Sequence, residues 1–162
     1  MNIVNASEIA ALSDDDASDF LLKLVYEYLD NITLNQMNAA QRTLYLAIRL
    51  EDICQADALP SLAEEPALLA ALPEMQQALE TLGLPETAAA IAELREMLRA
   101  DGIAIPDWDW FSAPERKERT AALDRRISSY PDGAAMPRYI AYMREHAAQL
   151  PEHMQENEFG TK

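Results

Sequence analysis

The sequence predicts an all-α protein, folded as a single-domain bundle of about six to seven helices. Three observations favour helices: alanine and leucine are abundant, glycine and β-branched runs are scarce, and apolar residues recur at spacings of three or four. The 162 residues are 49% hydrophobic and 25% charged, which is typical of one globular domain with its own core. We therefore expect a single domain over residues 1–150 and a polar, frayed tail over residues 151–162.

Two helices are predicted in the first third of the chain. The first begins after Ser13, whose hydroxyl can cap it, because the aspartates at positions 14–16 suit the positive end of the helix dipole. Its apolar stripe consists of Phe20, Leu21, Leu24, Val25, Tyr28 and Leu29. The second follows Asn38, which has capping-box spacing from Gln41. Apolar residues on most of its sides indicate a central, buried helix: Leu44, Leu46, Ile48, Leu50 and Ile53.

Prolines and glycines mark the next two helices. Pro66 suits the first turn of a helix that Pro73 either restarts or kinks. Gly83 is expected to end this stretch, and Pro85 to open a helix that runs to Gly102. The pattern predicts a tight helical hairpin.

Two more helices are predicted toward the C-terminus. Ser112 and Glu115 have capping-box spacing, and a final helix is expected after Pro137. Between the hairpin and Ser112 lies a connection with both tryptophans, Trp108 and Trp110. Its aromatic rings suit either an interface anchor or a plug for the core, and we expect the core role.

Negative charge dominates the chain. There are 28 Asp and Glu residues against 13 Lys and Arg, a net charge of −15. Residues 1–110 hold 20 acidic and 5 basic residues, whereas residues 111–162 hold 8 of each, so all the excess lies in the first part. This balance disfavours direct binding to nucleic acid and favours a cationic protein partner.

The candidate partner-binding surface is acidic. Helical spacing places four carboxylates near one another on the polar side of the first helix, with Lys23 as the only local cation: Asp16, Asp19, Glu27 and Asp30. One interpretation is a solvated face that aids solubility. The other is imitation of a polyanion, since B-DNA carries one charge per about 1.7 Å and fifteen charges match roughly 25 Å of duplex. The candidate residues are Asp15, Asp16, Asp19, Glu27, Asp30, Glu51, Asp52, Asp57, Glu64, Glu65, Glu74, Glu80, Glu86, Glu93 and Glu96.

No pattern in the sequence predicts catalysis, a metal or a cofactor. The four glycines lie too far apart for a phosphate-binding loop. His146 and His153 lack the spacing of zinc or di-iron sites, and the aspartates at 14–16 lack the loop glycine of a calcium site. Cys54 lies in an apolar helix and is expected to be a buried, inert thiol. A protein without catalytic, metal or cofactor-binding residues is the expectation.

The sequence also carries expectations on location and assembly. A single cysteine, and no targeting or membrane-spanning segment, favour the cytoplasm, with no membrane partner. One short basic stretch, formed by Arg116, Lys117, Arg119, Arg125 and Arg126, suggests a homodimer in which this stretch meets the acidic part of a second copy.

The hairpin carries a family resemblance. The segments Ala78-Leu79-Glu80-Thr81-Leu82-Gly83 and Thr87-Ala88-Ala89-Ala90-Ile91 resemble a family of small, acidic, all-helical bacterial proteins that includes a dimeric DNA mimic. Over roughly residues 40 to 145, Pro106, Arg116 or Arg119, and Tyr130 follow in a similar order, and Glu51 is kept. The chain departs from the family at Cys54–Leu59, which replaces an Asn-Gly-Gly-aromatic turn.

The resemblance implies a helical dimer without catalysis that inhibits a DNA-binding protein by imitating DNA. The leading hypothesis is therefore a non-enzymatic acidic protein that occupies the DNA-binding surface of a basic protein such as a transcription factor. The alternatives are an immunity or antitoxin protein that blocks a basic toxin, a metal-dependent hydrolase with paired carboxylates, and a purely structural subunit.

Overall fold

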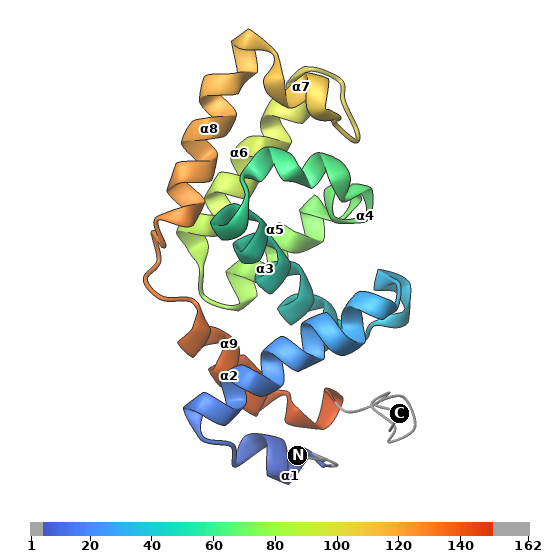
Figure 1. Ribbon diagram of the computed structural model, residues 1–162, viewed down its shortest axis with the longest axis vertical. Coiled ribbons are helices and arrows are strands. Elements are labelled where there is room, and N and C mark those ends of the chain that lie inside the picture. Colours follow the sequence, from blue (N-terminus) through green and yellow to red (C-terminus); the bar gives the residue numbers. More distant parts are fainter. Residues whose placement is uncertain (1–4, 151–162) are drawn as a thin grey trace. The chain divides into compact units, whose positions relative to one another are not determined.

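The computed structural model describes residues 5–150, and these form helices without any β-strand, which confirms the all-α prediction (Figure 1). Six helices have ten residues or more: α2 (Asp14–Lys23), α3 (Ala39–Ala56), α5 (Leu72–Thr81), α6 (Pro85–Ala100), α8 (Pro114–Ser128) and α9 (Met136–Glu145). Shorter α-helices are α1 (Ala6–Ala10), α4 (Pro66–Ala70) and α7 (Trp108–Ser112). A π-helix, η1 (Leu24–Tyr28), and four 3₁₀ helices complete the described chain: η2 (Leu29–Asn31), η3 (Leu34–Gln36), η4 (Leu59–Glu64) and η5 (Ala147–Gln149).

The described residues group into two compact units. Unit 1 comprises residues 5–45 and 136–150, and unit 2 comprises residues 46–135. Helix α3 contributes residues to both units. The single domain over residues 1–150 stays a prediction, and the tail expected over residues 151–162 lies outside the described residues.

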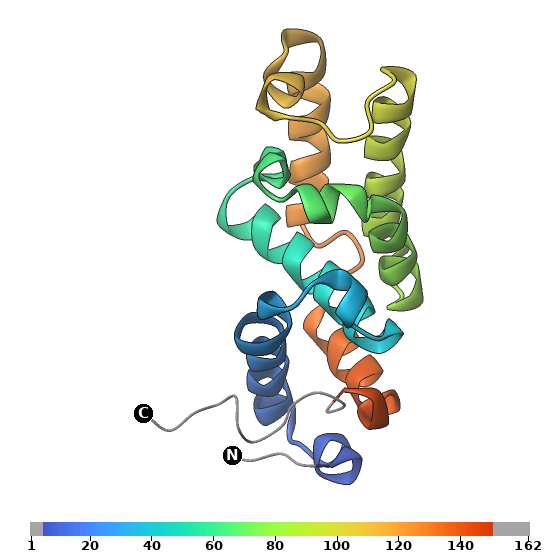
Figure 2. The same ribbon diagram turned by 90° about the vertical axis from the view of Figure 1, so that its right-hand side faces the viewer.

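In unit 1, helix α2 packs against α9, and α1 packs against α9 and η5 (Figure 2). The expected apolar stripe runs along α2, η1 and the start of η2, and all six of its residues are buried: Phe20, Leu21, Leu24, Val25, Tyr28 and Leu29. Ser13 caps α2 as predicted, since its Oγ accepts a hydrogen bond from the Asp16 backbone N–H at 3.2 Å. The local signal of a serine before three aspartates therefore fixed this helix start.

The predicted capping box at the start of α3 is present and connects two distant parts of unit 1. The Asn38 N–H donates to Gln41 Oε1, and the Gln41 N–H donates to Asn38 Oδ1, each at 3.0 Å. The Gln41 side chain is fully buried, and its Nε2 donates to the Leu150 carbonyl oxygen at 3.3 Å. Asn38 Nδ2 donates to the Gln149 carbonyl oxygen at 2.6 Å. These side chains thus hold the residues after α9 against the start of α3.

In unit 2, helices α5 and α6 form the predicted hairpin, α6 also packs against α8, and η4 contacts α4, α7 and α8. Both helices of the hairpin end on a glycine in the left-handed region, Gly83 at φ 74° and Gly102 at φ 67°. After each glycine the chain closes a Schellman motif: the Leu84 N–H donates to the Leu79 carbonyl oxygen at 2.8 Å, and the Ile103 N–H donates to that of Leu98 at 2.9 Å.

The structure decides the alternative left open at Pro73 and contradicts the prediction at Ser112. Pro73 restarts the helix, because α4 ends at Ala70 and α5 begins at Leu72. The capping role predicted for Ser112 is wrong. Ser112 is the last residue of α7, and its Oγ donates to the Trp108 carbonyl oxygen at 2.8 Å. Helix α8 instead begins at Pro114, which needs no partner for a backbone N–H.

Helix α6 is capped from a distant loop, and this cap yields a prediction. Asp132 accepts hydrogen bonds from the backbone N–H groups of Glu86 and Thr87, each at 2.9 Å. We expect Asp132→Ala to lower the free energy of unfolding by about 1–2 kcal/mol, the usual cost of losing a helix cap, as measured by urea denaturation. Asp57→Ala is the control, since the exposed Asp57 side chain makes no hydrogen bond or ion pair within residues 5–150. Equal stability of the two variants would contradict the capping role.

Candidate acidic interface

The structure exposes nearly all of the fifteen candidate carboxylates. Glu51 and Glu65 are half-buried, and the other thirteen are exposed. Five of the fifteen lie in unit 1, on α2, η1 and η2: Asp15, Asp16, Asp19, Glu27 and Asp30. The other ten lie in unit 2.

Within unit 1, the carboxylates of Asp15, Asp19 and Glu27 make no hydrogen bond or ion pair with any other described side chain, although Lys23 lies between them along the chain. Asp16 accepts from Ser13 Oγ at 2.8 Å, and Asp30 from the Tyr45 hydroxyl at 3.0 Å. We call Asp15, Asp19 and Glu27 the α2–η1 acidic row.

The π-helix changes the helical spacing that the sequence predicted for Asp16, Asp19, Glu27 and Asp30. Its i to i+5 hydrogen bonds start at Leu24, so Glu27 and Asp30 do not take the angular positions that an uninterrupted α-helix would give them. Leu22, which is 42% exposed, lies between Asp19 and Glu27 along the chain. An exposed apolar side chain, that of Leu22, therefore accompanies the α2–η1 acidic row.

In unit 2, three arginines form ion pairs with five of the ten candidate carboxylates. Arg49 pairs with Glu65 at 3.0 Å and with Asp52 at 3.9 Å. Two further arginines add three pairs: Arg126 reaches both Glu86 at 3.5 Å and Glu93 at 3.3 Å, and Arg99 pairs with Glu96. The hydrogen bonds from the Arg99 guanidinium hold the pKa of Glu96 below its usual value. These pairs reduce the negative potential that unit 2 presents to solvent.

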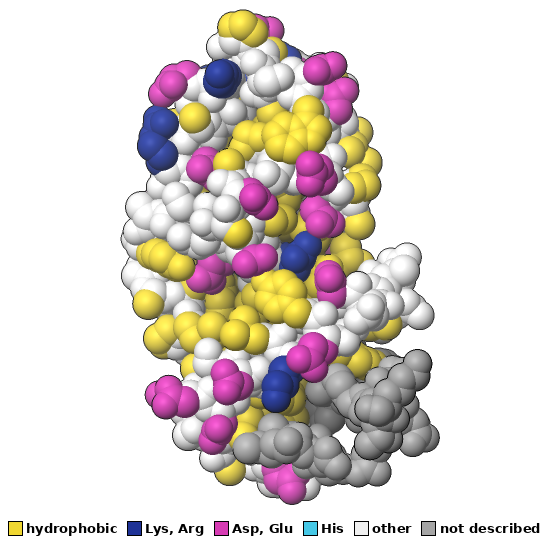
Figure 3. Space-filling model, in the orientation of Figure 1, with side chains coloured by type: hydrophobic (Ala, Val, Ile, Leu, Met, Phe, Trp, Pro, Cys, Tyr) yellow, Lys and Arg dark blue, Asp and Glu magenta, His cyan; other side chains and the backbone are white. Residues whose placement is uncertain are grey.

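Two further candidates in unit 2 accept hydrogen bonds from uncharged side chains. Glu51 accepts from the Tyr130 hydroxyl at 3.0 Å, and Glu80 accepts from Gln76 Nε2 at 3.1 Å. Partial burial and the Glu51 charge raise the pKa of Tyr130, which therefore stays a protonated donor near neutral pH. On the face shown in Figure 3, acidic side chains are interspersed with hydrophobic, other uncharged and a few basic side chains. That face carries spaced carboxylates instead of an unbroken acidic sheet.

The basic stretch predicted to join two copies is largely engaged within its own chain. Arg116 pairs with Asp101 at 3.3 Å, and Arg125 pairs with Glu118 at 3.0 Å. Arg126 holds the two glutamates of α6 named above. Only Lys117 and Arg119 of this stretch are exposed and lack an ion pair within residues 5–150.

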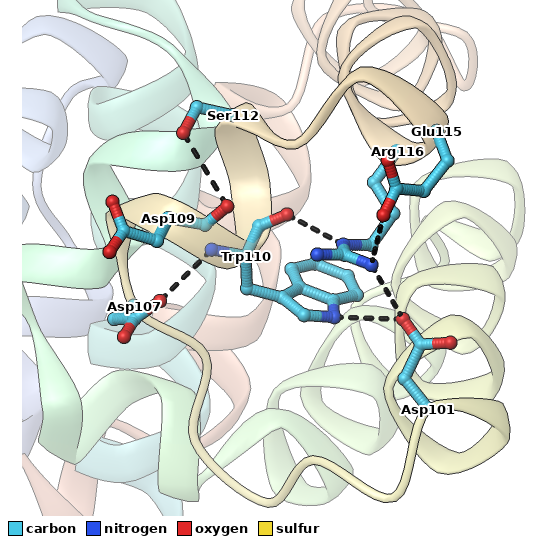
Figure 4. A network of polar contacts seen from close by, with 7 residues as sticks. All are labelled: Asp101, Asp107, Asp109, Trp110, Ser112, Glu115 and Arg116. Carbon is cyan, nitrogen blue, oxygen red and sulfur yellow. Dashed lines mark hydrogen bonds and ion pairs between the residues drawn. The ribbon is translucent and has the colours of Figure 1, made fainter.

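The two tryptophans have separate roles. Trp110 is buried at 6% exposure, as the core interpretation expects, whereas Trp108 is 46% exposed. Figure 4 shows the polar contacts around Trp110. Its Nε1 donates to Asp101 Oδ2 at 2.9 Å, and its carbonyl oxygen accepts from Arg116 Nε at 2.6 Å. The Arg116 guanidinium lies 5.0 Å from the indole ring centre, a cation–π distance. Sequence reasoning missed Asp101, because nothing local marks it as the partner of a tryptophan nine residues away.

Two residues considered as candidates for catalysis or metal binding, Cys54 and His146, pack against other residues of the chain. Cys54 is buried, and burial, reinforced by the Asp124 carboxylate, raises the pKa of its thiol far above neutral pH. The His146 ring stacks on Tyr142 at 3.9 Å, while His153 lies outside the described residues. Over residues 5–150, no group of three or more His, Cys, Asp or Glu side chains is arranged to hold a metal ion. In the same residues no helix combines the length and apolar character needed to cross a membrane.

The unbalanced charge predicts a salt effect on stability. A net charge of −15 repels itself in the folded state, and ions screen that repulsion over about 10 Å at 0.1 M ionic strength. We expect the melting temperature to rise by several degrees when sodium chloride is raised from low concentration to about 0.5 M. Thermal unfolding followed by circular dichroism would measure this shift. A melting temperature that falls over this range would show that the arginine pairs outweigh the repulsion.

Comparison with known proteins assigns the chain to a family. The family model of the DMP19-like proteins matches residues 35–146, from just before α3 to the residue after α9. Searches of curated proteins and of solved structures gave no match. The matched segment spans more than half of the chain and contains the hairpin segments that carried the resemblance. The chain therefore belongs to the DMP19-like protein family.

Proposed function

We propose that this chain is a non-enzymatic interaction protein that presents carboxylates in place of DNA phosphates to a basic protein. Its partner is a DNA-binding protein, such as a transcription factor, whose cationic surface it occupies. Membership of a DNA-mimic family supports this function. A cytoplasmic location, where such a partner meets DNA, is part of the proposal.

The observation that carries the proposal is the α2–η1 acidic row. Asp15, Asp19 and Glu27 are exposed and make no ion pair with another described residue, so their charge is not cancelled locally. With a rise of about 1.5 Å per residue, Asp15 and Asp19 lie about 6 Å apart along the helix axis. This is close to two phosphate steps along one DNA strand, at about 3.4 Å each.

The N-terminal segment concentrates charge further. Residues 1–34 hold seven acidic residues and one lysine, whereas the segment matched by the family model holds 18 acidic and 11 basic residues. A cationic groove would be attracted to such a segment from a distance, and the encounter would speed up as salt is lowered. Within unit 2, the exposed carboxylates of Asp57 and Glu64, which make no ion pair in the described chain, would also offer negative charge to such a partner.

The test is affinity capture followed by competition. The full chain is immobilised, exposed to a bacterial lysate at low salt, and washed with duplex DNA or with raised sodium chloride. We expect the retained proteins to be basic, and to be released both by duplex DNA and by salt, because each competes for the same cationic groups. Partners that are not basic, or one tight partner that duplex DNA does not displace, would contradict mimicry. The latter result would favour an immunity protein.

A further inference from the structure

Tyr130 is held in a backbone conformation that tyrosine rarely adopts. It follows Ser129, the residue that caps the C-terminal end of α8, and its φ of 54° lies in the left-handed region. Glycine is the usual residue at this position of a helix end, because a Cβ atom is strained there. Pro131 disfavours the conformation further, since a proline restricts the residue before it to extended backbone. Strain of this kind persists only where the surrounding structure imposes it, and it often marks a functional position.

The Tyr130 side chain lies at the surface of unit 2 with one end fixed. Its hydroxyl donates to Glu51 Oε1 on α3 at 3.0 Å, and 41% of the residue is exposed. Within residues 5–150 no other side chain stacks on its ring. Glu51 is half-buried, so the fold positions both the carboxylate and the ring that is bonded to it. An aromatic face and a carboxylate are therefore adjacent, and the face is accessible to another molecule.

Unit 2 contains the same arrangement elsewhere, with a third member. Trp110 Nε1 donates to Asp101 Oδ2 at 2.9 Å, as the Tyr130 hydroxyl does to Glu51 (Figure 4). There the Arg116 guanidinium lies 5.0 Å from the indole ring centre, and its Nη1 is 3.3 Å from the same Asp101 oxygen. A guanidinium suits this place because it is planar, stacks on aromatic rings and donates hydrogen bonds to a carboxylate.

The arginines nearest to Tyr130 along the chain are engaged elsewhere. Arg125 and Arg126 form ion pairs with glutamates of α8 and α6. The ring of Tyr130 therefore has no arginine over it in the described part of the chain, although the ring and the carboxylate match those that hold Arg116. A guanidinium that completed this arrangement would come from another protein.

We propose that Tyr130 and Glu51 form a receptor for an arginine side chain of the basic partner. The guanidinium lies over the Tyr130 ring and donates to the Glu51 carboxylate, whose two oxygens can accept several hydrogen bonds. Lysine fits less well, because its ammonium group is a compact, strongly hydrated charge without a planar face. The inference rests on the proposed function for the nature of the partner, and it adds a contact in unit 2 that selects arginine over lysine.

The test compares an oligoarginine peptide with an oligolysine peptide of the same length, each titrated into the full chain by isothermal titration calorimetry. We expect Tyr130→Ala to weaken oligoarginine binding about three- to fivefold, the effect of an exposed cation–π contact, and to change oligolysine binding little. The dependence of affinity on salt should stay the same, because no charge is removed. Tyr130→Phe keeps the ring and should keep most of the preference for arginine.

Two further variants separate binding from stability and from general aromatic character. Tyr130→Gly should unfold at a higher urea concentration than Tyr130→Ala, since glycine adopts a positive φ without strain. Both variants should nevertheless lose the arginine preference equally, because both lack the ring. Trp108→Ala is the matched control, since it removes a similarly exposed aromatic side chain of unit 2 and should leave the preference unchanged. Circular dichroism confirms that each variant is folded.

The outcomes distinguish this proposal from the proposed function. Unchanged oligoarginine binding in Tyr130→Ala and Tyr130→Gly would overturn the arginine receptor. Equal losses for the two peptides would also overturn it, and so would an equal effect of Trp108→Ala. If the arginine preference depends on Tyr130 but lysate capture yields no partner that duplex DNA displaces, the receptor stands and imitation of DNA does not.

Discussion

Replacement of Trp110 by alanine is expected to lower the free energy of unfolding by about 3–5 kcal/mol, the range for removing a large buried aromatic side chain. The indole is 6% exposed and packs edge-on against Phe111, with ring centres 5.1 Å apart. Its loss also removes the N–H that Asp101 accepts and the ring over which Arg116 lies. Urea denaturation followed by circular dichroism measures the change.

Trp108→Ala is the control for this prediction, because the same residue type is removed two positions away. Trp108 is 46% exposed, and its side chain makes no hydrogen bond in the described chain, so we expect a loss of about 1 kcal/mol or less. The comparison is made at low protein concentration, where self-association contributes nothing to stability. If the two variants were equally stable, Trp110 would not be the anchor of this connection.

Local signals in the sequence predicted much of the fold. Ser13 caps α2, Asn38 and Gln41 form a capping box, and Gly83 ends α5, because each depends on residues within a few positions. The prediction at Ser112 failed because Pro114 competes for the same helix start. The cap of α6 was not predictable, since Asp132 reaches it from 45 residues away.

The candidate interface was predictable only in part. Composition gives the net charge of the chain. The local charge of a surface also depends on which Lys and Arg side chains form ion pairs with its carboxylates in the folded protein. The pair between Glu96 and Arg99 follows from helical spacing. In contrast, Arg126 reaches Glu93 and Glu86 across 33 and 40 residues, and no local pattern announces such contacts. Because these arginines pair with carboxylates of unit 2, the proposed function depends mainly on the α2–η1 acidic row, whose carboxylates have no ion pair in the described chain.

Removal of the charges of the α2–η1 acidic row is expected to have the largest effect on binding. A chain with Asp15→Asn, Asp19→Asn and Glu27→Gln should bind the DNA-displaceable partner about ten to a hundred times more weakly. Each carboxylate that imitates a phosphate contributes about one unit to the slope of log affinity against log salt, so the slope should fall by up to about three. Titrations at several salt concentrations measure both quantities.

The matched control removes the same number of charges from carboxylates that arginines already neutralise: Glu65→Gln, Glu86→Gln and Glu93→Gln. If binding responded only to net charge, the two triple variants would lose affinity equally. If the α2–η1 acidic row takes the place of phosphates, the control should keep most of its affinity and its salt slope, because Arg49 and Arg126 already hold its carboxylates in ion pairs. Equal losses would therefore contradict a defined mimic surface and leave a diffuse electrostatic attraction.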